Sequence, residues 1–280
     1  MKEKKVSLLN RKSAWEKDWD DLKKKEAKYQ EKRNQGPTSV LLEKLDRFIP
    51  QKLNDTLDLA FSKAFALIFE KGTGVIEKTY NKEQKQADFL VDAYATEIRA
   101  DKKSVKRFTK RAKASKTANL MITGVEGIGL GLVGAGLPDI PLFVAMVLKS
   151  VYEVALSYGY DYESDGEKAF ILKVIETSMY DGEEFIEQNR RLNELIEDVV
   201  YDGDTLEGYE IDKAGQIDKT AKALSKEMLY TKFLQGIPLV GVAGGTYDVV
   251  FLHRIQQYAR IKYQRRLLLA QRKNFEGLDF

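Results

Sequence analysis

Apolar residues recur along most of this chain at intervals of three and four positions, the spacing of one face of an α-helix. The pattern runs through residues 40–59, 60–76 and 81–118, where leucine, isoleucine, phenylalanine and alanine stand between charged positions. No alternation of apolar and polar residues is long enough to predict a sheet, so the pattern predicts an all-α fold. Further helices are expected at residues 140–158, 167–180, 183–201 and 209–235.

The N-terminal part of the chain is dense in lysine, glutamate and aspartate, from residue 2 to residue 33. We predict a charged helical extension over residues 1–36 and one helical domain over residues 37–280. The extension is expected to lay a charged face against the body, and a basic arm for acidic lipid or nucleic acid is the alternative. Its sparse apolar anchors stand at roughly helical spacing: Trp15, Trp19, Leu22 and Tyr29.

Two glycine-rich apolar segments interrupt the charged sequence, GVEGIGLGLVGAG from Gly124 and GIPLVGVAGGTYDVVFL from Gly236. Glycine inside a helix costs about 1 kcal/mol relative to alanine, so an isolated helix over the first segment is disfavoured. Both segments are expected to pack at the centre of the domain or to form an insertion surface. The close-packing positions are Gly127, Gly131, Gly241 and Gly245.

A bilayer-spanning helix is the other interpretation of the first glycine segment. Residues 118–137 would reach about 30 Å as a helix, which is long enough to cross the hydrocarbon core. Glu126 near its centre costs roughly 3 kcal/mol on insertion scales, and the glycines add little apolar area. The sequence therefore favours a surface mode over spanning.

The known chemical motifs are incomplete or absent. Gly129, Gly131 and Gly134 match the dinucleotide fingerprint, but Pro138 falls where its helix should continue. The chain has no cysteine and a single histidine, His253, and lacks the Walker, HExxH and GxSxG patterns. The EF-hand-like start at residues 161–166 has leucine at the twelfth position, where calcium needs a bidentate glutamate. We predict no cofactor and no metal, and we interpret residues 161–166 as a turn between helices.

Three acids stand within apolar sequence, Glu126, Asp139 and Asp248. Desolvation would raise the pKa of such carboxyls, and together they would suit general acid–base work if they converged. The alternative is structural: Asp139 caps the helix that begins near Ile140, and the other two acids bond backbone or hydroxyl groups.

The net charge of +3 hides an uneven distribution, because residues 102–116 carry eight Lys or Arg and no acid, and residues 260–273 are again basic. Each basic residue near anionic lipid contributes about 1 kcal/mol of binding. Nucleic acid is the competing partner, with Phe108, Tyr258 and Tyr263 for stacking, but both basic stretches adjoin apolar segments, which favours lipid. The residues predicted to face a membrane or partner are Lys102, Lys103, Lys106, Arg107, Lys110, Arg111, Arg260, Lys262, Arg265 and Arg266.

Two blocks of the chain resemble the bacterial EcsC family. The first is GLPDIPLFVAMVLKSVYEVALSYGYD with the acidic turn and EKAFILKVIE that follow, and the second is IPLVGVAGGTYDVVFLHRIQQYARIKYQRR. The resemblance covers roughly residues 40–269 and leaves the charged extension outside. It implies a helical protein, first named from an operon that encodes an ABC transporter linked to secretion, with no defined catalytic residues.

The N-terminus has no apolar stretch of a secretory signal, which predicts a cytoplasmic protein. The expected function is a non-enzymatic, membrane-proximal accessory role at the inner membrane face or on a membrane protein. The alternatives are a hydrolase-like enzyme that uses the embedded carboxylates and a soluble helical interaction scaffold.

Overall fold

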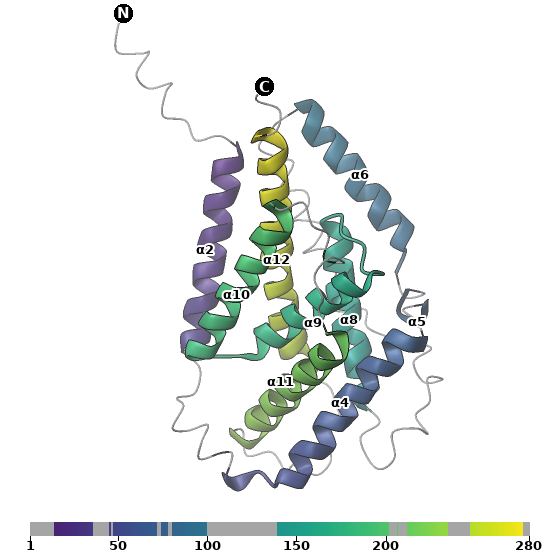
Figure 1. Cartoon of the computed structure of the whole chain (residues 1–280), viewed down its shortest axis with the longest axis vertical. Coiled ribbons are helices and arrows are strands. Elements are labelled where there is room, and N and C mark those ends of the chain that lie inside the picture. The colour runs from purple at the N-terminus through teal and green to yellow at the C-terminus, as the bar shows by residue number, and fades with distance from the viewer. Residues whose placement is uncertain are drawn as a thin grey trace, which may run out of the picture.

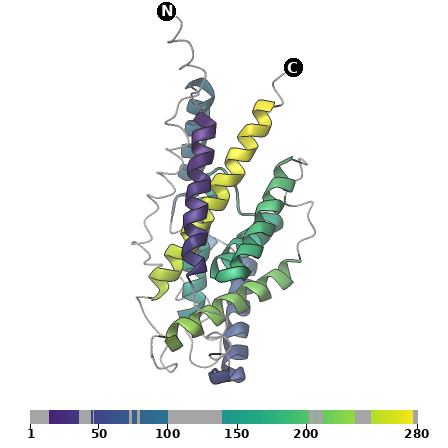
Figure 2. The same ribbon diagram turned by 90° about the vertical axis from the view of Figure 1, so that its left-hand side faces the viewer.

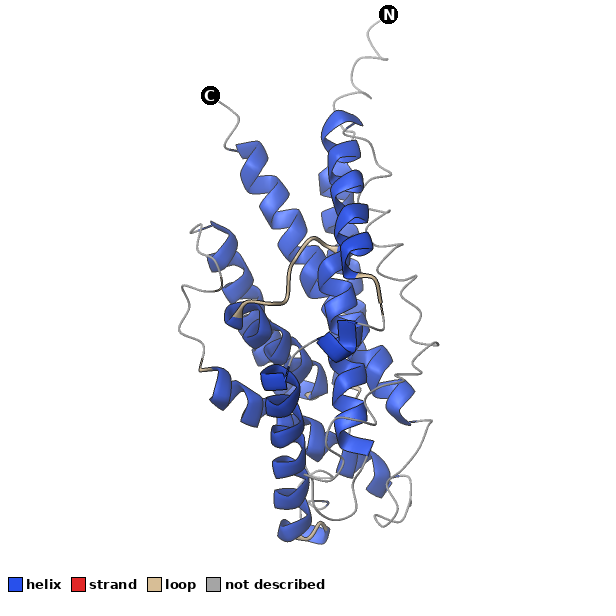
Figure 3. Ribbon diagram, turned by 90° about the vertical axis from the view of Figure 1, so that its right-hand side faces the viewer, coloured by secondary structure: helices blue, strands red, loops and turns tan. Residues whose placement is uncertain are grey.

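The described part of the chain is almost entirely helical. The computed structural model describes residues 14–35, 45, 47–71, 74–77, 80–99, 139–201, 206, 212–234 and 247–276. No strand occurs in these ranges, which confirms the predicted all-α fold (Figures 1 and 3). The helices are α2 (Ala14–Asn34), α4 (Gln51–Lys71), α5 (Gly74–Glu77), α6 (Lys82–Arg99), α8 (Asp139–Ser157), α9 (Asp165–Met179), α10 (Gly182–Tyr201), α11 (Lys213–Leu234) and α12 (Tyr247–Glu276).

Helix α12 lies at the centre of the packing. It spans 30 residues and contacts α2, α8, α9 and α10 (Figures 1 and 2). Ile255, Ala259 and Leu268 on this helix are fully buried. A strongly basic helix in such a place must meet partner groups on its neighbours, because a buried charge is tolerated only when it is paired and hydrogen-bonded.

Helix α8 supplies the apolar core on the other side of α12. It packs against α4, α5, α6 and α12, and Val144, Val147 and Leu148 are fully buried. In the described ranges, Ile140–Ser157 is the one helix long and apolar enough to cross a membrane, and 89% of that window is buried inside the protein. Packing against neighbouring helices therefore accounts for its apolar faces.

Proline and glycine decide several helix ends. The sequence predicted helices over 40–59 and 60–76, but α4 begins after Pro50 and continues through that boundary to Lys71. Proline has no amide to donate and a fixed φ, so it suits a helix start, and the carbonyl of Pro50 accepts the amides of Leu53 and Asn54. Gly159 ends α8 as predicted, with a φ of +83°, and a Cβ there would collide with the Phe89 ring.

Helix α2 lies against α10 and α12, so the first and last described helices are neighbours in space. Leu22 and Tyr29 are its buried apolar residues, and Trp15 Nε1 donates to the carbonyl of Leu268 at 2.8 Å. The predicted arrangement, a charged helix with one face against the body, describes this contact. The same face also buries the charged residues Asp18 and Glu26.

Candidate functional site

The residues proposed for acid–base chemistry lie largely outside the described structure. Asp139 is the first residue of α8 and Asp248 lies in α12, but the side chains of both are outside the described part of the structure. All of Glu126 is outside it. Whether the three carboxylates converge therefore stays a prediction. The residues predicted for close packing and six of the basic surface residues also lie outside the described part, so their roles stay predictions: Gly127, Gly131, Gly241, Gly245, Lys102, Lys103, Lys106, Arg107, Lys110 and Arg111.

Two of the four basic residues predicted on the surface of α12 are buried in the structure. Lys262 is 0% exposed and Arg266 is 6% exposed, while Arg260 and Arg265 are half-buried. The sequence shows that this helix is basic but not that four helices surround it. Lys262 and Arg266 face acidic side chains of other helices instead of solvent.

A cluster of donors from α10 and α12 surrounds the carboxylate of Glu26, which comes from α2. Lys262 Nζ and Asn193 Nδ2 donate to Glu26 Oε1, the latter at 3.1 Å, and Arg265 Nη2 donates to Oε2 at 3.1 Å. The Asn193 carbonyl accepts a second bond from Lys262 at 2.6 Å, which fixes the orientation of its amide. We call Asn193, Lys262 and Arg265 the anion cradle.

The charges of the cradle shift both partner pKa values. Burial alone would raise the pKa of the Glu26 carboxyl, but Lys262 and Arg265 outweigh it and lower the pKa to about 2. Burial lowers the pKa of the Lys262 ammonium to about 8, against the opposing effect of Glu26. At neutral pH the pair is an ammonium and a carboxylate, desolvated together between helices that lie far apart in sequence.

A second buried pair fastens α12 to α9. Arg266 Nη1 donates to both carboxylate oxygens of Glu167, at 2.8 and 2.9 Å, and the Tyr263 hydroxyl donates to the same carboxylate at 2.6 Å. The guanidinium also lies over the rings of Tyr160 and Phe170, at 4.0 and 4.5 Å. Such a planar group can combine ring stacking with donation to a carboxylate, which an ammonium cannot reproduce.

A third set of charges lies at the other end of α2, where Arg254 of α12 is the central group. It donates to Glu227 of α11 and to the carbonyl of Tyr180, and it lies 3.4 Å from Asp181. Arg33 of α2 reaches the same Asp181 at 3.3 Å. Burial raises the pKa of the Asp181 carboxyl, against the opposing effect of the two arginines.

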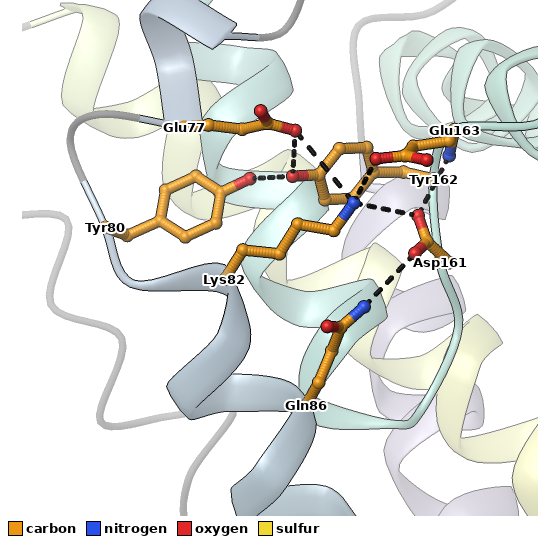
Figure 4. A network of polar contacts seen from close by, with 7 residues as sticks. All are labelled: Glu77, Tyr80, Lys82, Gln86, Asp161, Tyr162 and Glu163. Atoms are coloured by element: carbon orange, nitrogen blue, oxygen red, sulfur yellow. Dashed lines mark hydrogen bonds and ion pairs between the residues drawn. The ribbon is translucent and has the colours of Figure 1, made fainter.

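A chain of hydroxyl donors joins α5, Tyr80 just before α6, and the loop between α8 and α9 (Figure 4). The Tyr80 hydroxyl donates to Tyr162 at 2.6 Å, and Tyr162 donates to Glu77 Oε1 at 2.8 Å. Burial, the Tyr80 hydroxyl and the Glu77 carboxylate all raise the pKa of Tyr162, so it remains a protonated donor. We call Glu77, Tyr80 and Tyr162 the tyrosine–glutamate network.

Lys82 covers this network from α6. Its ammonium lies 4.6 Å from the Tyr162 ring centroid and pairs with Asp161 at 3.3 Å and with Glu163 (Figure 4). Residues 161–164 join α8 to α9, and the last two residues of the predicted turn, Asp165 and Gly166, begin α9. Ser164 caps α9 by accepting the Glu167 amide. The described residues contain no group of three or more acids or histidines that could hold a metal ion.

Tyr152 differs from the other buried tyrosines near this network. Its ring stacks on that of Tyr162 with centroids 4.0 Å apart, and its hydroxyl is buried without a hydrogen-bond partner in the described structure. Burial raises the pKa of Tyr152, with Tyr80 and Glu77 adding to the shift. The groups of the network bond one another and Tyr152 packs as a ring, so the cluster fastens α5 and α6 to the body.

The exposed apolar residues gather most closely on α6. Leu90 and Val91 are 65% and 63% exposed at adjacent positions, and α6 packs against α8 along the outer edge of the molecule (Figure 1). Sequence reasoning missed this pair, because periodicity alone does not say which apolar positions of a helix find a partner. It also missed Glu26 and Glu167, although Glu167 begins the helical sequence EKAFILKVIE as an acid before an apolar run.

Together these features describe an all-α protein whose central basic helix is neutralised by acids from α2, α9 and α11. The chain belongs to the EcsC protein family, whose model matches residues 16–268. The match begins inside α2, so the charged helix that we expected outside the family resemblance is part of it. A comparison with curated proteins and one with solved structures found no match.

Proposed function

We propose that the protein associates peripherally with the anionic, inner face of the cytoplasmic membrane through α6 and the basic segment that follows it. The observation that supports this proposal most directly is that Leu90 and Val91, adjacent on α6, are both exposed. Eight Lys or Arg and no acid follow at residues 102–116. Apolar side chains beside a basic run are the composition of an interfacial membrane contact.

The energetics of this contact favour a reversible attachment. Each basic residue near an anionic surface contributes about 1 kcal/mol and is screened by salt within a Debye length. Burying a large aliphatic side chain contributes about 1.5–3 kcal/mol at most. The eight basic residues therefore supply most of the binding free energy at low salt and the apolar pair adds to it, so we expect attachment to weaken when either is removed. The packing of α8 inside the protein supports a peripheral mode.

Flotation of the full chain with vesicles tests this function. We expect the protein to float with vesicles of phosphatidylcholine and phosphatidylglycerol at low salt, to stay behind with phosphatidylcholine alone, and to be released by high salt. Failure to float with anionic vesicles at low salt would contradict the proposal. Flotation with native membranes but not with protein-free anionic vesicles would identify a membrane protein as the target, such as the transporter that the family resemblance implies.

Matched variants locate the contact. Leu90→Asn with Val91→Asn removes the apolar pair and should reduce the floated fraction severalfold. Leu59→Asn on α4 is the control, because Leu59 is 55% exposed yet lies on another helix. Equal losses from both variants would show that general surface polarity, and not α6, governs binding. The hydrolase interpretation depends on acids outside the described residues and stays a prediction.

A further inference from the structure

The anion cradle is built by the body of the protein and filled by a helix from its N-terminus. Asn193 and Lys262 hold one oxygen of the Glu26 carboxylate, and Arg265 holds the other. The three donors belong to α10 and α12, and the anion belongs to α2. Chemically, the Glu26 carboxylate stands where a separate anion would be held by two cations and an amide.

The cradle has one more donor than the carboxylate uses. Arg265 Nε is buried and donates to no acceptor in the described structure, although Nη1 of the same guanidinium reaches Glu197 at 3.0 Å. Both oxygens of Glu26 are already engaged. A phosphate group offers more acceptor oxygens than a carboxylate, and a guanidinium can donate through two of its nitrogens to such an anion.

The attachment of α2 combines apolar packing with buried charge. Among its 21 residues, Leu22 and Tyr29 are the buried apolar side chains. Trp15 and Trp19 also pack against the hydrophobic core. The charged contacts of α2 are Glu26 in the cradle and Arg33 on Asp181, and the Trp19 ring lies 5.2 Å from the Arg265 guanidinium carbon. A desolvated ion pair contributes little net stability, so a competing anion can replace the Glu26 carboxylate at a modest cost in free energy.

We propose that the anion cradle is a binding site for a phosphate group, that Glu26 occupies it as an internal ligand, and that a phosphate-bearing ligand displaces α2 from α12. This site is separate from the membrane contact on α6 and does not require it. Binding would expose the face of α2 that carries Leu22 and Tyr29 and leave Lys262 and Arg265 paired to the incoming anion.

The chain carries its own reporter for this displacement. Its two tryptophans, Trp15 and Trp19, both lie on α2. Their rings stack with centroids 5.3 Å apart against α12. Release of α2 should shift their emission to longer wavelength and increase quenching by acrylamide, while the far-ultraviolet circular dichroism of the other helices stays in place.

The experiment titrates the full chain with inorganic phosphate at constant ionic strength, and separately with phosphatidylglycerol vesicles, while tryptophan emission and quenching are followed. Glu26→Gln removes the competing charge, so α2 should start partly released and its release should be complete at a phosphate concentration at least about tenfold lower than in the unchanged chain, the effect of one charged hydrogen bond. Glu31→Gln is the control, because Glu31 is exposed on the same helix and should leave the titration unchanged.

Arg265→Gln in the Glu26→Gln background should abolish the response. If that variant fails to fold, Asn193→Asp places a negative charge in the cradle and should also abolish it. A vesicle response without a free-phosphate response would assign the phosphate to a lipid headgroup and support the site. A response that survives both cradle variants would overturn the proposal, and so would the absence of a response to both probes. It would also be overturned if analytical sedimentation showed that α2 is released only when two chains form a dimer.

Discussion

At the scale of single residues, the protein keeps its interior charges in matched sets. Arg266 and Glu167 are both nearly fully buried and bonded through two contacts. Removing one member of such a pair leaves an uncompensated buried charge and costs about 3–5 kcal/mol, although the intact pair contributes much less. The buried charges therefore specify which helices meet more than they stabilise the fold.

Tyr162 and Tyr152 give a matched test of the tyrosine–glutamate network. Tyr162→Phe removes the donor to Glu77 and the acceptor of the Tyr80 hydroxyl, so we expect a loss of about 1–3 kcal/mol in the free energy of unfolding. Tyr152→Phe removes a hydroxyl without a partner and should change stability by less than about 0.5 kcal/mol or increase it. Urea denaturation followed by circular dichroism measures both, and equal losses would contradict this description of the network.

At the scale of elements, the helices were predictable wherever one face is apolar and a glycine marks the end. The stop at Gly159 is of this kind, because its positive φ favours glycine. The inward position of the basic helix α12 was not predictable. Its partner Glu26 stands 236 positions before Lys262, and a basic run has the same sequence whether water or acids surround it.

The attachment of α2 should depend on pH through Glu26. Its pKa is about 2 in the folded protein against an ordinary value of 4.5, so the unfolded chain binds more protons between these values. The stabilisation is present above about pH 4.5 and is lost as the pH falls toward 2. Lys262, Arg265 and Asn193 face this carboxyl and remain hydrogen-bond donors in that window.

Tryptophan emission measures this dependence directly. In the unchanged chain and in Glu31→Gln, emission should move to longer wavelength over that pH interval. Glu26→Gln should show a shallower pH dependence, because glutamine does not titrate. The same acid transition in all three proteins would mean that another carboxyl controls the release of α2.

At the scale of the whole molecule, the chain encloses its most apolar described helix and leaves an edge helix with exposed apolar side chains. The sequence predicted the all-α class and the family, because both depend on local pattern. It identified neither Leu90 and Val91 as exposed nor α8 as internal, because exposure depends on which helices pack together. The predicted acid site stays a prediction, because its side chains lie outside the described part of the structure. Both glycine segments also stay predictions, because only the C-terminal part of the second one is described, in α12.

The most direct test of the membrane proposal places a probe on α6. The chain has no cysteine, so Val91→Cys gives a single labelling site for an environment-sensitive fluorophore, with Leu59→Cys on α4 as its matched control. Addition of phosphatidylglycerol vesicles at low salt should shift the emission of the probe at position 91 to shorter wavelength and leave position 59 unchanged. No shift at position 91, or equal shifts at both positions, would contradict a membrane contact through α6.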